Sequence, residues 1–386
     1  MKKKLGFVLF CALAVCSLIY HSRQTSDVVG SQMAHASNAV SSTMQQVGHP
    51  TFVSPHASPI RLIDDLVFVV NTPSYTVDVL DAGTREIKKR IDVGIDPVSL
   101  AVRPDGKELW VSNHVSDSES VVDTDTASPT FLQIVGTVQE FDADTRATRF
   151  DEPVGIAFAS NEKAYIALSS ENQIAIVDVA SRNVTGHLRI PAQDPRQIIV
   201  RNGVLYVIPF ESNNKTQLSG GTGQLDGDLV TFNAHEHSIA NNNVLSLGAV
   251  VDIVKHPRVP DRDLFVFDAE SDRLIETVES LGTLLYGMTV NSKGRVYIAQ
   301  TDARNEVNGR AGTKDHGLAE LENRAFLNRI TSVLPRTNEI ANSQQYKADV
   351  KFIELEPLPP QHPEPEDALA TPFAIEVSDD DATLFV

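Results

Sequence analysis

Three acidic residues that each directly precede a proline are the side chains of this sequence with the clearest capacity for chemistry. They are Asp96, Glu152 and Asp194. Three carboxylates that converge on one point could hold a divalent cation or bind the hydroxyl groups of a polar ligand. An acidic residue before proline is also ordinary turn chemistry, because its carboxylate bonds to nearby backbone groups. The residues alone leave both interpretations open.

Histidines are the other candidates for metal binding. The segment His235–His237 could place two imidazoles on one side of a strand, and His114 and His256 could join them. A zinc site needs three or four converging ligands, and neither HExxH nor a comparable spacing occurs in the sequence. We therefore interpret these residues as exposed loop histidines and assign no metal ligand.

Nucleophilic and nucleotide-dependent chemistry has no supporting motif. The sequence contains neither GxSxG nor a Walker loop, and the Gly220–Gly223 run does not follow a strand that leads into a helix. Both cysteines, Cys11 and Cys16, lie in the leader, so the remaining residues have no thiolate ligand and no CxxCH haem attachment. We name no catalytic residue and expect no cofactor in this chain beyond a divalent cation at the carboxylates.

The N-terminal leader and the net charge restrict the cellular location of the protein and the partners that it can bind. Lys2 to Lys4 precede an apolar stretch, Leu5 to Tyr20, which is typical of an export signal and short for a membrane span. We expect residues 1–23 to be a signal peptide or membrane anchor and residues 24–50 to be a flexible spacer. The net charge of -18 argues against nucleic acid as a partner. The protein is expected to be periplasmic, extracellular or attached to the cell envelope, with membrane contact through its N-terminal segment alone.

One sequence pattern recurs along the rest of the chain. A proline, an apolar alternation and a Gly/Asp/Asn turn lead into a short strand with an aromatic residue, and two further strands follow. The repeat length is 42 residues between Pro153 and Pro195. The aromatic position is filled in turn by Trp110, Tyr165, Tyr206 and Tyr297. This regularity predicts packing between neighbouring repeats and not a ligand cage.

Four short strands per unit predict the blade of a β-propeller. We expect an all-β fold of four-stranded antiparallel blades over residues 51–386, with five blades and part of a sixth recognisable and insertions near 210–262 and 302–370. The spacing of apolar residues from Leu318 to Leu334 predicts one helical insertion. Leu384 to Val386 is predicted as the second strand of an unfinished blade, so we expect the natural polypeptide to continue.

Three segments carry a resemblance to a known family. They are Phe68–Asn71, the turn Pro104–Gly106 and Trp110–Asn113, and they resemble the YVTN-repeat propellers, often called YncE-like. The resemblance covers about Ile60 to Val386 and implies an exported disc of seven blades when complete. In a propeller the loop that enters each innermost strand lies at one mouth of the central channel, which is where the three carboxylates are expected.

We favour a function as a binding or scaffold module for a protein, a glycan or a fused partner domain, because the sequence contains no complete set of catalytic residues. The resemblance leaves two alternatives. One is the accessory propeller of a periplasmic c-type cytochrome or haem-peroxidase-like electron-transfer protein, whose haem segment would lie beyond residue 386. The other is a lactonase-like hydrolase, in which Asp96, Glu152 or Asp194 would be required for turnover.

Overall fold

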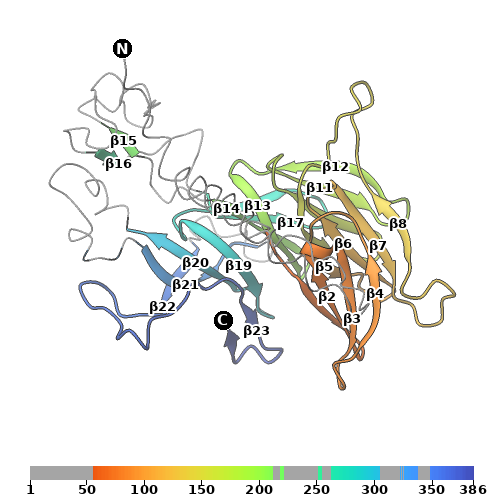
Figure 1. Ribbon diagram of the computed structural model, residues 1–386. Coiled ribbons are helices and arrows are strands. Elements are labelled where there is room, and N and C mark those ends of the chain that lie inside the picture. The colour runs from red at the N-terminus through yellow and green to blue at the C-terminus, as the bar shows by residue number, and fades with distance from the viewer. Residues whose placement is uncertain are drawn as a thin grey trace, which may run out of the picture.

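The computed structural model describes residues 55–211, 262–304, 322, 324, 326–337 and 348–386, together with the backbone of 218–220 and 251–253. The expected leader and spacer lie outside the described residues, as do His235–His237, His256 and most of the insertion near 210–262. The described residues form antiparallel sheets that lie side by side in chain order (Figure 1). Among them, no helix is both long enough and apolar enough to cross a lipid bilayer.

Each of the first three sheets is one blade of four consecutive strands. Blade 1 contains β1 (Ile60–Ile63), β2 (Leu66–Asn71), β3 (Thr76–Asp81) and β4 (Ile87–Asp92). Blade 2 contains β5 (Pro97–Val102), β6 (Glu108–Asn113), β7 (Ser118–Asp123) and β8 (Ile134–Val138). Blade 3 contains β9 (Pro153–Phe158), β10 (Lys163–Leu168), β11 (Gln173–Asp178) and β12 (Asn183–Arg189). The short 3-10 turn η1 (Thr72–Ser74) links β2 to β3.

The later blades keep this order around longer connections. Blade 4 contains β13 (Gln193–Arg201), β14 (Val204–Glu211), β17 (Leu264–Asp268) and β18 (Leu274–Val278), with the small pair β15 (Leu218–Gly220) and β16 (Val251–Ile253) between its second and third strands. Blade 5 contains β19 (Leu284–Val290), β20 (Val296–Ala303), β21 (Phe326–Leu334) and β22 (Asp349–Glu354). A hairpin of β23 (Glu376–Val377) and β24 (Leu384–Phe385) follows. The predicted all-β fold is confirmed. Among the described residues, blades 1 to 3 are separate four-stranded sheets, whereas blades 4 and 5 are joined into one eight-stranded sheet by the pairing of Glu211 with Leu284.

The first strands of successive sheets contact one another, from β1 to β5, β9, β13, β19 and β23. They are therefore the inner strands around the central axis. Each blade-to-blade interface is apolar and contains the aromatic residue of the preceding blade's second strand. Trp110, Tyr165 and Tyr206 are buried against blades 3, 4 and 5 respectively. This confirms that the repeated aromatic position serves packing between blades.

The predicted helix from Leu318 to Leu334 is wrong over the part that the structure describes. Phe326–Leu334 is strand β21, paired with β20 on one side and β22 on the other. The β-branched residues Ile330, Thr331 and Val333 suit a strand, and the ladders of backbone hydrogen bonds to β20 and β22 outweigh the helical spacing of apolar residues. Arg324, just before this strand, forms an ion pair of 2.8 Å with Glu356.

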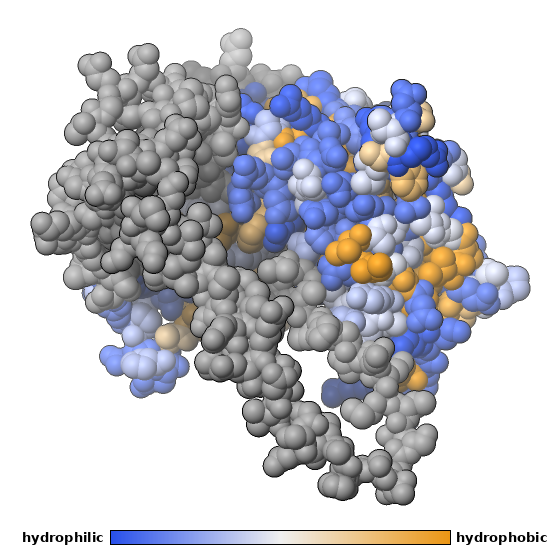
Figure 2. Space-filling view, turned by 45° about the horizontal axis from the view of Figure 1, so that its top comes forward, coloured by the Kyte–Doolittle hydropathy of each residue, from blue (hydrophilic) through white to orange (hydrophobic). Residues whose placement is uncertain are grey.

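On the face of the molecule that Figure 2 shows, the described residues are mostly hydrophilic, with apolar residues gathered in a few places. The predominance of polar groups agrees with the acidic composition of the chain. Contiguous exposed apolar patches often mark contact sites for other polypeptides.

Candidate functional site

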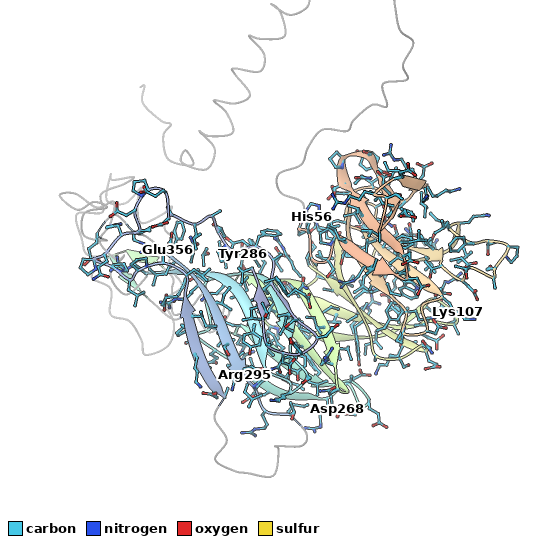
Figure 3. The ribbon with its side chains drawn as sticks, turned by 90° about the horizontal axis from the view of Figure 1, so that it is seen from below. His56, Lys107, Asp268, Tyr286, Arg295 and Glu356 are labelled. Atoms are coloured by element: carbon cyan, nitrogen blue, oxygen red, sulfur yellow. The ribbon has the colours of Figure 1, made fainter. Side chains whose placement is uncertain are left out.

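The loops that enter the inner strands lie on one side of the sheets, here called the mouth side. Figure 3 shows His56, Tyr286 and Glu356 on this side and Lys107, Asp268 and Arg295 on the other. His56 precedes β1, Tyr286 lies near the start of β19 and Glu356 follows the end of β22. Every connection between blades therefore passes along the mouth side.

The three predicted carboxylates adopt one recurring backbone conformation. Asp96, Glu152 and Asp194 have φ angles of 60°, 51° and 60°, in the left-handed region that few residues other than glycine occupy. Each is followed by a proline, at or near the start of an inner strand. A left-handed residue turns the chain sharply, so this conformation directs each connection into its inner strand. The turn-forming interpretation of these residues thus has direct structural support.

Asp194 is engaged with a residue of its own strand. Its Oδ1 accepts a hydrogen bond from Arg196 Nε at 2.9 Å, and its Oδ2 lies 2.5 Å from Arg196 Nη2. Its backbone N–H donates to Asn172 Oδ1 at 2.8 Å. Both carboxylate oxygens thus bind a planar guanidinium, which fixes the arginine in place.

Glu152 belongs to an acidic group between blades 2 and 3. Its side chain is 48% exposed, and its Oε2 lies 4.0 Å from His114 Nε2. Its backbone N–H donates to Asp117 Oδ1 at 3.2 Å, and Ser169 Oγ donates to its carbonyl at 3.1 Å. Burial raises the pKa of the Asp117 carboxyl, and the nearby charges of Asp151 and Glu152 act in the same direction. The half-exposed side chain of Glu152 gives this half of the mouth an acidic character.

Asp96 differs from the other two because it is buried, with 6% of its surface exposed. Its carbonyl accepts a hydrogen bond of 2.9 Å from the backbone N–H of His114. Within the described ranges, no group of three or more His, Cys, Asp or Glu side chains has the arrangement of a metal site. The three carboxylates thus have three different environments, and binding of a divalent cation there stays a prediction.

A row of aromatic side chains occupies the other half of the mouth. Arg196 lies with its guanidinium carbon 3.7 Å from the centroid of the Phe210 ring. The Phe210 and Tyr286 rings are 5.5 Å apart in an edge arrangement, and the Tyr286 and Phe373 rings are 5.6 Å apart. We call these four residues the aromatic row. They come from blade 4, from blade 5 and from the segment that leads into β23.

Irregularities in the inner strands position this row. The pairing of β13 with β14 shifts between Pro195 and Gln197, and that of β19 with β20 shifts between Leu285 and Gly287. Arg196 and Tyr286 are the residues at these bulges. A bulge adds one residue to a strand and redirects its side chain, commonly near functional sites. Both side chains consequently join the row on the mouth side.

Two glycines next to these bulges allow the inner strands to approach one another. A Cβ atom on Gly155 would lie 2.2 Å from the Arg196 carbonyl oxygen, and one on Gly287 would lie 2.8 Å from the Phe373 carbonyl oxygen. Both positions therefore require glycine, since a backbone atom cannot move aside like a flexible side chain. The close contact fixes the bulge of one blade against the strand of its neighbour.

Reasoning from the sequence missed the aromatic row. A signal was present, because Arg196, Tyr286 and Phe373 each come one residue after the proline position of the repeat, where blades 2 and 3 have Val98 and Val154. The change from valine to large planar side chains in successive repeats distinguishes this side of the mouth. Phe210 lies at the end of a second strand and had no comparable signal.

These features define a β-propeller with acidic and aromatic side chains on its mouth side. Among solved structures, the chain is similar to hydrazine synthase of Kuenenia stuttgartiensis, with a TM-score of 0.56 and 17% identity over 90% of this chain and 76% of that chain. Two further structures were found at lower TM-scores. The WD40 β-propeller domain of Doa1 has a TM-score of 0.40 and 9% identity over 62% of this chain and 58% of that chain. A chain of the mitotic checkpoint complex has a TM-score of 0.47 and 11% identity over 83% of this chain and 69% of that chain. No protein-family model matches the chain, and no curated protein matches it. At 17% identity, the likeness to hydrazine synthase bears on the fold alone.

Proposed function

We propose that this chain is an exported propeller of the YVTN type that acts as a binding module, with a segment of a partner protein docking on the mouth side. The observation that carries the proposal is the aromatic row. Three successive repeats contribute to one row of contacting planar side chains, which ends in Phe373 with 50% of its surface exposed. A few residues carry most of the binding free energy in protein interfaces, and these are enriched in Trp, Tyr and Arg.

The surroundings of the row indicate the chemistry of the partner. Leu369 is also 50% exposed, and its N–H donates to Glu356 Oε1 at 3.0 Å, which places it on the mouth side. The opposite half of the mouth carries the carboxylates of Asp117 and Glu152, in a chain with a net charge of -18. A segment with an apolar side chain near a lysine or arginine would complement both halves.

A peptide selection tests this function. A random peptide library displayed on phage is selected on the immobilised chain, and the enriched peptides are then measured against two variants. Phe373→Ala removes the exposed end of the aromatic row. Phe352→Ala is the matched control, because Phe352 is 42% exposed and lies under the guanidinium of Arg329 at 4.6 Å, but on the outer strand β22.

We expect enrichment of peptides that combine basic and apolar residues. Their binding should weaken at least tenfold with Phe373→Ala, which corresponds to about 1.4 kcal/mol, and should change little with Phe352→Ala. Equal binding to both variants would contradict the proposal, as would a selection that yields no binding peptide.

A further inference from the structure

Three exposed apolar side chains lie on the mouth side of blades 1 and 2. Tyr75 lies between β2 and β3, Ile95 lies just before β5 and Val115 follows β6. These connections share the mouth side because an antiparallel blade turns there after its second and fourth strands. The three residues are 47%, 45% and 59% exposed. We call them the apolar patch.

Backbone hydrogen bonds between the loops hold the apolar patch together. The N–H of Val93 donates to the carbonyl of Tyr75 at 2.9 Å, and the N–H of Val115 donates to the carbonyl of Ile95 at 3.2 Å. Ser116 Oγ accepts a further hydrogen bond of 2.9 Å from the N–H of Ile95. The loops are thus ordered before a partner binds, which lowers the entropic cost of binding.

Blades 3 and 4 have polar residues where blade 2 has Ile95 and Val115. Ile95 comes two residues before the proline of its inner strand, and Val115 comes two residues after the residue that pairs with this proline. The same count in the next two blades gives Asp151 and Ser170 in blade 3, and Gln193 and Glu211 in blade 4. Since polar residues serve these turns equally well, the fold does not require apolar side chains here.

Tyr75 adopts a backbone conformation for which its neighbours use smaller residues. Its φ and ψ angles are 59° and 39°, in the left-handed region. The residues directly before the third strands of blades 2 and 3 are Asp117 and Asn172, with φ angles of 49° and 52°. Asp and Asn tolerate this region, whereas a bulky residue there is strained. Backbone strain of this kind concentrates at functional sites, so the exposed tyrosine indicates a contact role.

Carboxylates border the apolar patch on the side of blade 3. The side chain of Glu152 is 48% exposed, and its backbone N–H donates to Asp117 Oδ1 at 3.2 Å. Asp117 lies two residues after Val115 in the same turn. In the order of blades, the mouth side therefore runs from the apolar patch through these carboxylates to the aromatic row.

We propose that the apolar patch binds a second apolar side chain of the partner segment, so that the segment presents an apolar, a basic and an apolar residue in this order across the mouth. The inference rests on the proposed function and adds the identity of the side chains that the partner must carry. The basic residue faces Glu152, where its charge is complementary to the carboxylate. The two apolar residues contact the apolar patch and the aromatic row.

Calorimetry with a peptide from the phage selection tests this inference. Ile95→Gln and Val115→Ser are combined in one variant, and Tyr75→Asn is a second variant. Each substitution introduces the residue type that blade 3 or blade 4 has at the equivalent position, so the turns should keep their structure. Ile134→Ser is the control, because Ile134 is 41% exposed at the start of the outer strand β8.

The Kd should rise about tenfold in the Ile95→Gln/Val115→Ser variant and stay within about twofold with Ile134→Ser. Tyr75→Asn should raise the Kd roughly threefold while it raises the Tm by about 1–2 °C, because the left-handed strain is relieved. A purely structural tyrosine would instead lower the Tm when replaced. The enriched peptides should carry a basic residue between two apolar ones.

The outcomes separate this inference from the proposed function. A Kd that rises with Phe373→Ala but not in the Ile95→Gln/Val115→Ser variant would overturn the inference and leave the proposed function in place. A rise in the Ile95→Gln/Val115→Ser variant alone would support the apolar patch and contradict the role of the aromatic row, and no rise in either would overturn both. Sedimentation that shows self-association of the chain, lost in the Ile95→Gln/Val115→Ser variant, would assign the apolar patch to a second copy and overturn the inference.

Discussion

The guanidinium of Arg196 is held between two groups, with its carbon 3.7 Å from the Phe210 ring centroid and its Nε 2.9 Å from Asp194 Oδ1. Asp194 also has the left-handed conformation at the start of β13. One residue predicted as a ligand therefore acts by positioning the aromatic row. A rigid row loses little conformational entropy when a partner binds, which favours affinity.

Arg196→Lys should loosen the row without removing its charge. Lysine cannot form the two parallel hydrogen bonds to Asp194 or lie flat on Phe210, so we expect a loss of about 1 kcal/mol in stability. Binding of a mouth-directed peptide should weaken by a factor of roughly 3 to 10. Urea unfolding and titration calorimetry measure the two effects. Arg146→Lys is the control, because the guanidinium carbon of Arg146 lies 5.7 Å from the centroid of the Phe141 ring. This substitution should change neither the stability nor the peptide affinity.

Gly155→Ala should destabilise the fold, because its Cβ would lie 2.2 Å from the Arg196 carbonyl oxygen. Overpacking of this kind costs about 1–3 kcal/mol. Gly186→Ala is the matched control, since the nearest atom to its Cβ is Ile176 Cδ1 at an ordinary 3.6 Å. Unfolding free energies from urea titration compare the two. Equal stability of both variants would show that the inner strands of blades 3 and 4 do not approach this closely.

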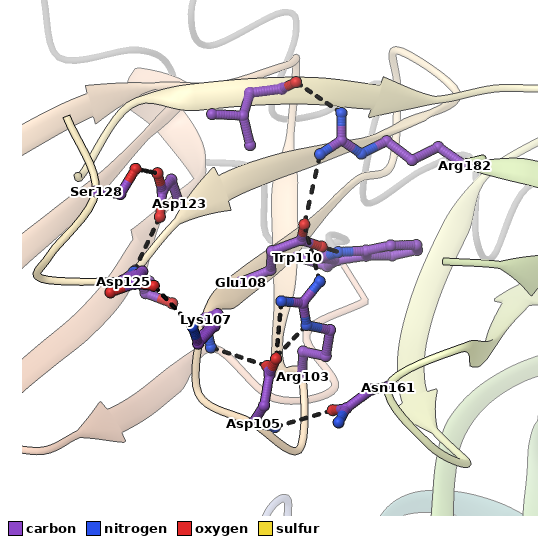
Figure 4. A network of polar contacts seen from close by, with 12 residues as sticks. Arg103, Asp105, Lys107, Glu108, Trp110, Asp123, Asp125, Ser128, Asn161 and Arg182 are labelled. Carbon is purple, nitrogen blue, oxygen red and sulfur yellow. Dashed lines mark hydrogen bonds and ion pairs between the residues drawn. The ribbon is translucent and has the colours of Figure 1, made fainter. Parts of the chain in front are cut away.

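Trp110 connects the apolar interface of blades 2 and 3 to a polar network on the side opposite the mouth (Figure 4). Its Nε1 donates to Glu108 Oε2 at 3.0 Å, and Glu108 Oε1 lies 3.1 Å from Arg103 and 3.5 Å from Arg182. Trp110→Ala should cost about 3–5 kcal/mol, since the side chain is fully buried. Tyr297→Ala should cost less, because Tyr297 is only partly buried. Thermal unfolding of the two variants would contradict this assignment if their losses were reversed.

Glu119 should make stability depend on pH. Its side chain is fully buried, Ser112 Oγ donates to its Oε1 at 2.8 Å, and its Oε2 has no hydrogen-bond partner in the described structure. Burial raises its pKa well above the ordinary value, while the bond from Ser112 lowers it. The folded state therefore keeps a proton that the unfolded chain loses above about pH 4.3, and stability falls as the pH rises from there towards the raised pKa.

Glu119→Gln removes this titration while keeping a similar shape. We expect the variant to gain stability relative to the original chain between about pH 5 and pH 8, by at most about 1.4 kcal/mol per pH unit. Urea titrations at several pH values measure the difference. Glu86→Gln, at a side chain that is 74% exposed, provides the control. A stability difference between the original chain and the Glu119→Gln variant that does not change with pH would contradict the assignment.

Much of the fold could be predicted from the sequence because each repeat carries its own local signals. Pro97, the turn at Gly106 and Trp110 mark the start, the turn and the packing position of one blade, and they recur in its neighbours. Phe326–Leu334 was misassigned because its pairing partners, β20 and β22, are supplied by segments beyond long connections. A strand specified by tertiary pairing leaves only an ambiguous local pattern.

The site was less predictable than the fold. The sequence placed Asp96, Glu152 and Asp194 at equivalent positions, but their partners differ because blade-specific residues surround them. Asp194 has Arg196 two residues away, whereas Glu152 lies beside His114 and Asp117 of the preceding blade. The aromatic row depends on ring contacts between different blades, which no single repeat encodes.

The most direct test of the proposed function is the affinity of one selected peptide, measured by titration calorimetry on three chains. We predict that Phe373→Ala raises the Kd at least tenfold relative to the original chain, and that Phe352→Ala leaves it within about twofold. A Kd that is unchanged by Phe373→Ala, or raised equally by both substitutions, would contradict the account of the mouth side as the docking surface.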